Sequence, residues 1–174
     1  MSSSKVRVAV RLKPEARTLR RCALAEGSNE VIVGAKRFTY DHVYNEETSQ
    51  IDIYNECVHD LVEGCFKGYN GTLFAYGQTG SGKTFSTIGL PHDTEDEGII
   101  PRALRHIFTY LDASSNEDEG GNKTIKLASV HVSFLEIYNE ECKDLLHPEI
   151  QSREIMIRED KGMPYYSVSP YCLI

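Results

Sequence analysis

Eight consecutive residues have the types and spacing needed to bind a polyphosphate. They match the pattern G-x-x-x-x-G-K-[ST], a glycine-rich phosphate loop that ends in a lysine followed by a hydroxyl residue. Backbone N–H groups of such a loop approach phosphates closely, and the helix that follows directs its positive dipole end at the same anion. The lysine would reach the outer phosphates, and the threonine hydroxyl would ligate Mg²⁺. The predicted ligand-binding residues are Gly77, Gln78, Thr79, Gly80, Ser81, Gly82, Lys83 and Thr84, with Thr84 also the predicted metal ligand.

A strand and a helix must hold this loop in place. Residues 72–76 form a short apolar run with aromatic and β-branched members, which predicts a buried strand, and Asn70-Gly71 before it is a turn signal. Residues 85–88 can continue a helix. An ordinary glycine-rich loop between a strand and a helix would need no Lys-Thr pair at the helix start. The sequence therefore favours a nucleotide site.

Composition limits the class of protein. The chain has 174 residues, which is long enough for one domain with a core. Apolar residues make up 40% of it, a content too high for a disordered chain. Its apolar runs fall well short of the roughly 18 residues that span a membrane, and no secretory apolar region follows Met1. Five dispersed cysteines without a C-x-x-C pair predict reduced thiols in a cytoplasmic protein.

The net charge of −7 is unevenly distributed. Residues 1–85 carry 11 basic and 10 acidic side chains, whereas residues 86–174 carry 8 basic and 16 acidic ones. An acidic second half disfavours binding to nucleic acid or to an anionic membrane. Most of these charges are interpreted as solvated loops.

Periodicity predicts the elements before the phosphate loop. Residues 6–12 alternate between apolar and other side chains and predict a strand that Pro14 ends. Residues 30–33 and 36–40 predict a small hairpin around Gly34. Thr48-Ser49 can cap a helix that Gly68 stops. The predicted core face of that helix is Ile51, Tyr54, Val58, Leu61, Val62 and Cys65.

After the loop, residues 89–98 form an acidic connection. A second helix is predicted from Pro101, with an apolar face made of Ala103, Leu104, Ile107, Phe108 and Leu111. Residues 124–136 predict a long strand with a bulge near Ala128-Ser129, and residues 155–157 predict a short one. Residues 138–146 have helix-like spacing that does not decide between helix and strand. Alternating strands and helices around a phosphate loop predict an α/β sheet.

Several segments together resemble a known family. Residues 74–85 resemble the nucleotide loop of kinesin motor domains at nearly every position. Four further segments resemble kinesin motor domains and occur in the same order as in that family: Val8-Ala9-Val10-Arg11-Leu12-Lys13-Pro14 and residues 98–103, 133–140 and 143–146. The resemblance covers about residues 5–161, and Gly-Tyr-Asn-Gly at 68–71 is similar to the branch that includes chromokinesins. It implies a P-loop NTPase fold, a mixed sheet flanked by helices, with ATP as nucleotide and microtubules (tubulin) as track.

The resemblance also implies roles for single residues. Arg11 and Pro14 would flank the adenine, and Phe85 would pack on the base, where stacking tolerates any flat ring. It recasts residues 138–146 as strand, turn and strand, and it identifies the acidic connection as the family's variable insertion. The family's main microtubule-binding face lies downstream of the matched region.

The sequence departs from the family in two ways. It contains neither N-x-x-S-S-R-S-H nor D-L-A-G-S-E, the motifs that position the attacking water and sense the γ-phosphate, so catalytic residues stay unknown. Past Lys161 the match decays, and residues 162–174 predict a divergent tail after a truncated, incomplete motor domain at 1–161. Two functions stay open: the ATP-binding part of a cytoskeletal, microtubule-based motor, or a nucleotide-binding fragment without turnover. An unrelated P-loop kinase or GTPase is disfavoured because neither a guanine-specifying N-K-x-D nor a lid-like arginine cluster occurs.

Overall fold

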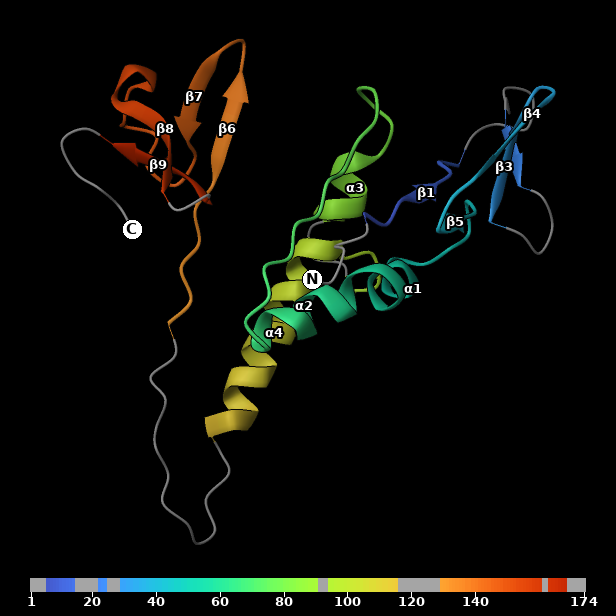
Figure 1. Ribbon diagram of the computed structural model, residues 1–174, viewed down its shortest axis with the longest axis horizontal. Helices are drawn as coiled ribbons and strands as arrows, with labels where there is room; N and C mark the ends of the chain where they lie inside the picture. The colour runs from blue at the N-terminus through green and yellow to red at the C-terminus, as the bar shows by residue number, and fades with distance from the viewer. Residues whose placement is uncertain are drawn as a thin grey trace, which may run out of the picture. The chain divides into compact units, whose positions relative to one another are not determined.

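The structure is a computed structural model that describes residues 6–14, 22–24, 29–90, 94–115, 129–160 and 163–168. The chain divides into two compact units, Met1–Lys123 and Thr124–Ile174, each of which is described by itself (Figure 1). None of the helices among the described residues is long and apolar enough to cross a membrane.

The strands of the first unit form two small sheets. The strand predicted over residues 6–12 forms only a three-residue strand, β1 (Ala9–Arg11), which pairs in parallel with β5 (His42–Tyr44). One further bond joins Leu12 N to Tyr44 O at 2.9 Å. The predicted hairpin is confirmed: β3 (Glu30–Val33) and β4 (Lys36–Thr39) pair antiparallel around Gly34, whose φ of 62° suits glycine. The strands are β1 (Ala9–Arg11), β2 (Cys22–Leu24), β3 (Glu30–Val33), β4 (Lys36–Thr39) and β5 (His42–Tyr44).

A continuous helical segment follows, capped as the sequence predicted. Ser49 is the N-cap, and its hydroxyl accepts from the backbone N–H of Asp52 at 3.2 Å. Of the predicted core face, Ile51 and Cys65 are exposed, whereas Ile53 is buried. A single α-helical period predicts that face, but the middle of the segment is a wider π turn, which changes the register of the buried face. The segment consists of α1 (Gln50–Ile53), η2 (Tyr54–Val58) and α2 (His59–Phe66).

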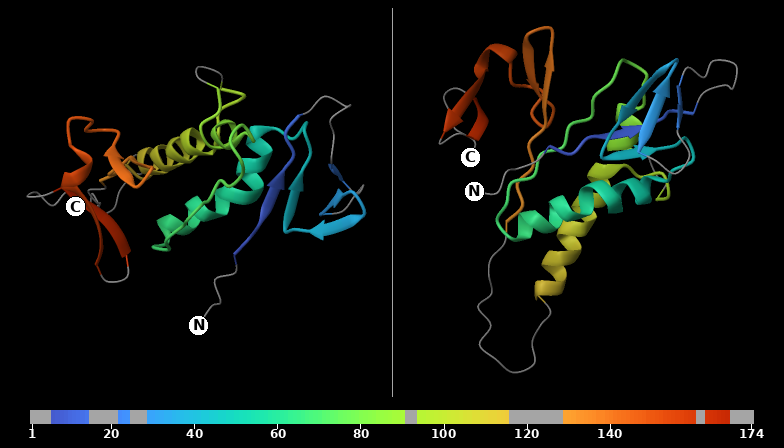
Figure 2. Two further views of the ribbon diagram at one scale, coloured as in Figure 1. Left: turned by 90° about the horizontal axis from the view of Figure 1, so that it is seen from above. Right: turned by 45° about the vertical axis from the view of Figure 1, so that its right-hand side comes forward.

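The core of the first unit lies between this segment and α4 (Ile99–Ser115), which pack together (Figure 2). Tyr54, Val58 and Val62 are buried and contact the apolar face of α4. The helix begins two residues before the predicted start at Pro101. Proline fits the first turn because its missing N–H has no partner there. Phe108, predicted on the core face, is 51% exposed.

The strand predicted before the phosphate loop is not formed. Residues 72–76 form no helix or strand and pair with no strand among the described residues, and Phe74 and Tyr76 are 90% and 100% exposed. A run of apolar, β-favouring residues becomes a strand only where a neighbouring strand supplies ladder bonds and a face to pack on. The helix after the loop, α3 (Lys83–Thr87), is formed as predicted.

The described residues of the second unit form two antiparallel strand pairs. Of the long strand predicted over residues 124–136, the first five residues lie outside the described part, residues 129–134 form no strand, and pairing begins only at Leu135. For residues 138–146 the resemblance implied a strand, a turn and a strand, and this is confirmed. Asn139 and Glu140 turn the chain with φ of 49° and 63° between two antiparallel strands. The strand predicted at 155–157 is confirmed and extends further. The elements are β6 (Leu135–Tyr138), β7 (Glu141–Asp144), η3 (Ser152–Glu154), β8 (Ile155–Asp160) and β9 (Met163–Val168).

Candidate functional site

The phosphate loop takes a conformation that only glycines allow at three positions. Gly77, Gly80 and Gly82 have φ of 154°, 79° and 98°, values that residues with a side chain rarely adopt. A Cβ at Gly77 would also collide with Ser81 Oγ. Gly82 is the N-cap of α3, so its left-handed conformation turns the chain directly into the helix. The glycine spacing therefore sets both the loop and the start of the helix.

The side chain of Lys83 folds back onto the first residues of the loop. Lys83 Nζ donates to the carbonyl oxygens of Gly77 at 2.7 Å and Gln78 at 3.0 Å. The backbone N–H of Ser81 closes the turn onto Gln78 O at 3.1 Å. Thr84 lies in the first turn of α3 with its side chain exposed. An ammonium group at the loop and a hydroxyl one residue later are the two groups that a magnesium-bound polyphosphate needs.

Arg11 and Phe85 lie in direct contact with each other. The guanidinium carbon of Arg11 is 5.0 Å from the centre of the Phe85 ring, a cation–π contact. Arg11 Nη1 donates to Gln50 Oε1 at 2.8 Å and to Ser86 Oγ at 3.0 Å. Burial lowers the pKa of Arg11, and the charge of Asp96 opposes that shift. The pair forms a fixed, flat, cationic surface beside the start of α3.

Two residues of this region were missed by the sequence reasoning. Gln50 is 3% exposed, accepts from Arg11, and donates through Nε2 to Phe85 O at 2.7 Å. Lys13 Nζ donates to Gly80 O at 2.8 Å and so links the end of β1 to the phosphate loop. No motif marks Gln50, because its role depends on a contact 35 residues away. Lys13 lies inside the Arg11–Pro14 stretch and could have been noted as a second cation.

A cavity of about 250 Å³ is lined both by Arg11 and Phe85 and by the end of the glycine loop. The predicted site residues that line it are Arg11, Pro14, Ser81, Gly82, Lys83 and Phe85, together with Lys13. Gly77, Gln78, Thr79, Gly80 and Thr84 belong to the same loop and helix but do not line this cavity. The structure thus brings Arg11, Pro14 and Phe85 to the side of the loop that carries Lys83.

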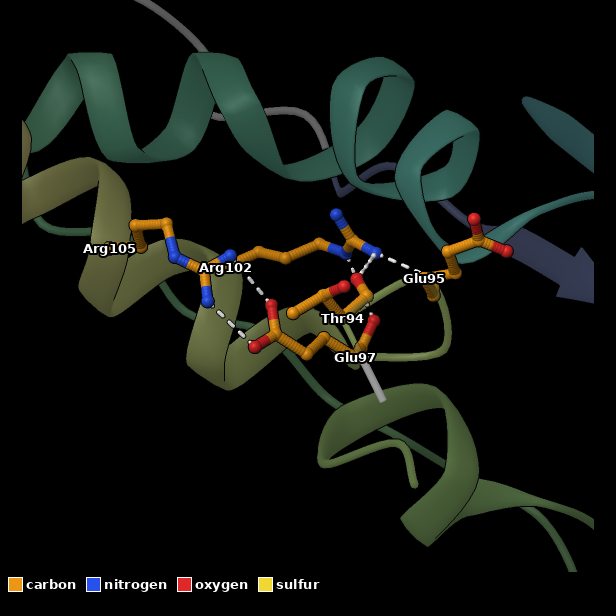
Figure 3. A network of polar contacts seen from close by, with 5 residues as sticks. All are labelled: Thr94, Glu95, Glu97, Arg102 and Arg105. Atoms are coloured by element: carbon orange, nitrogen blue, oxygen red, sulfur yellow. Dashed lines mark hydrogen bonds and ion pairs between the residues drawn. The ribbon is translucent and has the colours of Figure 1, made fainter. Parts of the chain in front are cut away.

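The acidic connection after α3 is fastened to α4 by two arginines (Figure 3). Arg105 binds the carboxylate of Glu97 with two contacts of 2.7 Å. Arg102 donates to the backbone oxygens of Thr94 at 3.1 Å, Glu95 at 2.8 Å and Glu97 at 2.9 Å. The hydrogen bond from Arg105 lowers the pKa of Glu97. The end of this connection is therefore an ordered part of the region.

Comparison with known sequences identifies the family. A sequence profile of the kinesin motor domain matches residues 5–169. The chain belongs to the kinesin motor domain family. The kinesin-like protein KIF21B of Mus musculus is 40% identical over 93% of this chain and 11% of its own length. The resemblance predicted from the phosphate loop and its flanking segments is confirmed.

Solved kinesin structures share the fold. A crystal structure of the Drosophila kinesin Kin10/NOD in complex with divalent manganese and ADP matches with a TM-score of 0.71 at 34% identity, covering 85% of this chain and 50% of that one. Drosophila NOD docked with bovine tubulin into a cryo-EM map of the microtubule complex matches with a TM-score of 0.70 at 34% identity, covering 84% of this chain and 50% of that one. The chain thus spans about half of these kinesin chains and about a tenth of KIF21B. The predicted α/β, P-loop NTPase fold class is confirmed.

Proposed function

We propose that this part of a kinesin motor domain binds ATP together with Mg²⁺. The observation that carries the proposal is the loop with three positive-φ glycines that places Lys83 and Thr84 at the start of α3. Lys83 would bind the outer phosphates, and Thr84 would ligate the metal. The related NOD structure, in complex with divalent manganese and ADP, supports a nucleotide and a divalent cation in this region.

We assign the adenine to the surface made by Arg11, Pro14 and Phe85. Arg11 and Phe85 are already in cation–π contact, and all three residues line the same cavity. A base that stacks on this surface would add aromatic contact without requiring any change in the backbone. Because Gln50 binds both Arg11 and the Phe85 carbonyl, it is a positioning residue for this surface.

A titration with a fluorescent ATP analogue in Mg²⁺ tests the proposal. Lys83→Ala should abolish saturable binding, because it removes the cation that faces the phosphates. Lys67→Ala is the matched control, since Lys67 is exposed beyond the end of α2 and should bind like the unchanged chain. Equal affinity of the Lys83→Ala and unchanged chains would show that the loop does not bind the phosphates.

The whole protein to which these residues belong is proposed to be a microtubule-based motor of the cytoplasm and cytoskeleton. The related NOD structure docked on the microtubule supports this partner. For residues 1–174 alone we propose ATP binding without turnover, because the sequence carries neither switch motif needed to position water and sense the γ-phosphate. We keep the division into a motor portion at 1–161 and a divergent tail at 162–174 as part of this proposal.

Phosphate release with and without microtubules separates these two functions. The 174-residue chain should bind ATP yet release phosphate at the uncatalysed rate in both conditions. Stimulation by microtubules would contradict the binding-only function and would show that these residues supply the catalytic groups themselves.

A further inference from the structure

Three potential metal ligands meet where α2 packs against α4. His59 and Glu63 are four residues apart on α2 and therefore share one face of that helix. His106 approaches them from α4, and the candidate ligand atoms of all three residues lie within 4.8 Å of one another. None of the three lines the cavity beside the phosphate loop. The cluster is therefore separate from the proposed nucleotide site.

The surroundings of His106 fix the direction of its ring. Its Nδ1 is 2.9 Å from the hydroxyl of Tyr54, and its Nε2 is 3.0 Å from Glu63 Oε1. The ring of Phe66 lies edge-on to it at 5.7 Å, and the ring of His59 stacks on it at 4.8 Å. Metal-bound histidines characteristically use their second ring nitrogen in this way, in a hydrogen bond that fixes tautomer and orientation. Here Tyr54 would accept the Nδ1 proton and leave Nε2 for a metal.

We propose that His59, Glu63 and His106 bind one Zn²⁺ ion, with water as the fourth ligand. Two imidazoles and one carboxylate with an open fourth position are a donor set that zinc accepts, whereas Mg²⁺ and Ca²⁺ prefer oxygen ligands throughout. Tetrahedral ligands about 2.0–2.1 Å from zinc lie roughly 3.3 Å from each other. The separation of 3.0 Å between His106 Nε2 and Glu63 Oε1 is close to that value.

Only His59 must move to complete the site. Its side chain is 45% exposed, so its ring has room to turn toward the other two ligands. The bound ion would join α2 to α4 beside the core residues Tyr54 and Val62. It would stabilise the first unit by linkage: at a free zinc concentration of 100 times the Kd, the folding equilibrium shifts by about 100-fold.

Zinc titration of the full chain, freed of any purification tag, tests the proposal. Calorimetry should give one Zn²⁺ per chain, no binding of Mg²⁺ at this site, and a higher melting temperature in zinc. His59→Ala should weaken zinc binding at least ten-fold while leaving the zinc-free melting temperature nearly unchanged, because His59 is partly exposed. Glu63→Gln should weaken it similarly, since a neutral amide is a poor ligand.

His147→Ala is the matched control. His147 Nδ1 lies 3.3 Å from Glu149 Oε1, an exposed histidine–glutamate pair in the second unit, and its loss should leave zinc binding unchanged. Cobalt substitution provides a direct readout, because tetrahedral Co²⁺ absorbs visible light. Zinc affinity that His59→Ala does not change, or a cobalt spectrum with thiolate charge transfer from cysteine, would overturn the proposal. An absence of any zinc-dependent shift would show instead that the cluster is a hydrogen-bonded structural contact.

Discussion

Replacing Gln50 by alanine tests whether one buried amide holds the surface that we propose for the adenine. Its side chain accepts from Arg11 at 2.8 Å and donates to Phe85 O at 2.7 Å, and a longer bond of 3.4 Å reaches Asp96 O. A hydrogen bond to a charged group contributes about 1.5–3 kcal/mol and a neutral one about 1 kcal/mol. Arg11 is only half-buried and keeps its bond to Ser86 Oγ at 3.0 Å, so the lower end of that range applies. We therefore expect a loss of about 2.5 kcal/mol in the free energy of unfolding.

Urea unfolding measures this loss. The chain has no tryptophan and ten tyrosines, so circular dichroism and tyrosine fluorescence are suitable probes. With a urea dependence of about 1–3 kcal/mol per molar, the Gln50→Ala midpoint should fall by roughly 1 M. The Kd for ATP should also rise several-fold, because Arg11 loses a partner that fixes it over Phe85.

The matched control is Gln151→Ala. Gln151 is exposed in the second unit, and its replacement should change stability by less than about 0.5 kcal/mol. If Gln50→Ala behaved like this control in both assays, the amide would not be holding Arg11 and Phe85. The buried amide would then have no part in nucleotide binding.

Three further predictions concern other parts of the structure. Gly77→Ala should weaken ATP binding at least ten-fold in the fluorescence titration, because the new Cβ collides with Ser81 Oγ, and unchanged affinity would contradict the loop conformation. Val58→Ala should lower the free energy of unfolding by about 2 kcal/mol, because the Val58 side chain is buried. Ile51→Ala, at an exposed position of the same helical segment, should lower it by less than about 1 kcal/mol, and equal losses would refute the π-turn register. The folded pKa of Glu97 is lowered, so its ion pair stabilises the chain above the ordinary glutamate pKa of 4.5 and is lost as pH falls through the folded value. In acid-unfolding curves Glu97→Gln should therefore flatten the decline in stability below pH 4.5, and parallel curves would contradict the assignment.

Features encoded by a few neighbouring residues could be predicted from the sequence. The phosphate loop depends on glycines and a lysine within eight positions, and the Ser49 cap on a hydroxyl three residues from the N–H that it binds. The β3–β4 hairpin likewise follows from local alternation around Gly34. The β6–β7 hairpin required the family resemblance, because spacing alone left helix and strand open.

Features that depend on distant partners could not be predicted. The expected strand at residues 72–76 has the right composition, but composition does not supply a neighbour with which to form ladder bonds. The π turn shifts the buried face away from Ile51, and no residue type in the sequence predicts such a turn. Gln50 and the cluster around His106 each join elements more than 30 residues apart, so only the folded chain shows them.

Hydrogen–deuterium exchange with and without saturating Mg-ADP tests most directly whether the glycine loop holds the phosphates. Backbone amides of residues 77–87 should exchange more slowly when nucleotide is bound, because the loop N–H groups would donate to phosphate oxygens. Peptides from residues 141–158 in the second unit should be unaffected and provide the internal reference. Protection of residues 77–87 is the predicted result. Bound nucleotide without any slowing in residues 77–87 would contradict the proposed site.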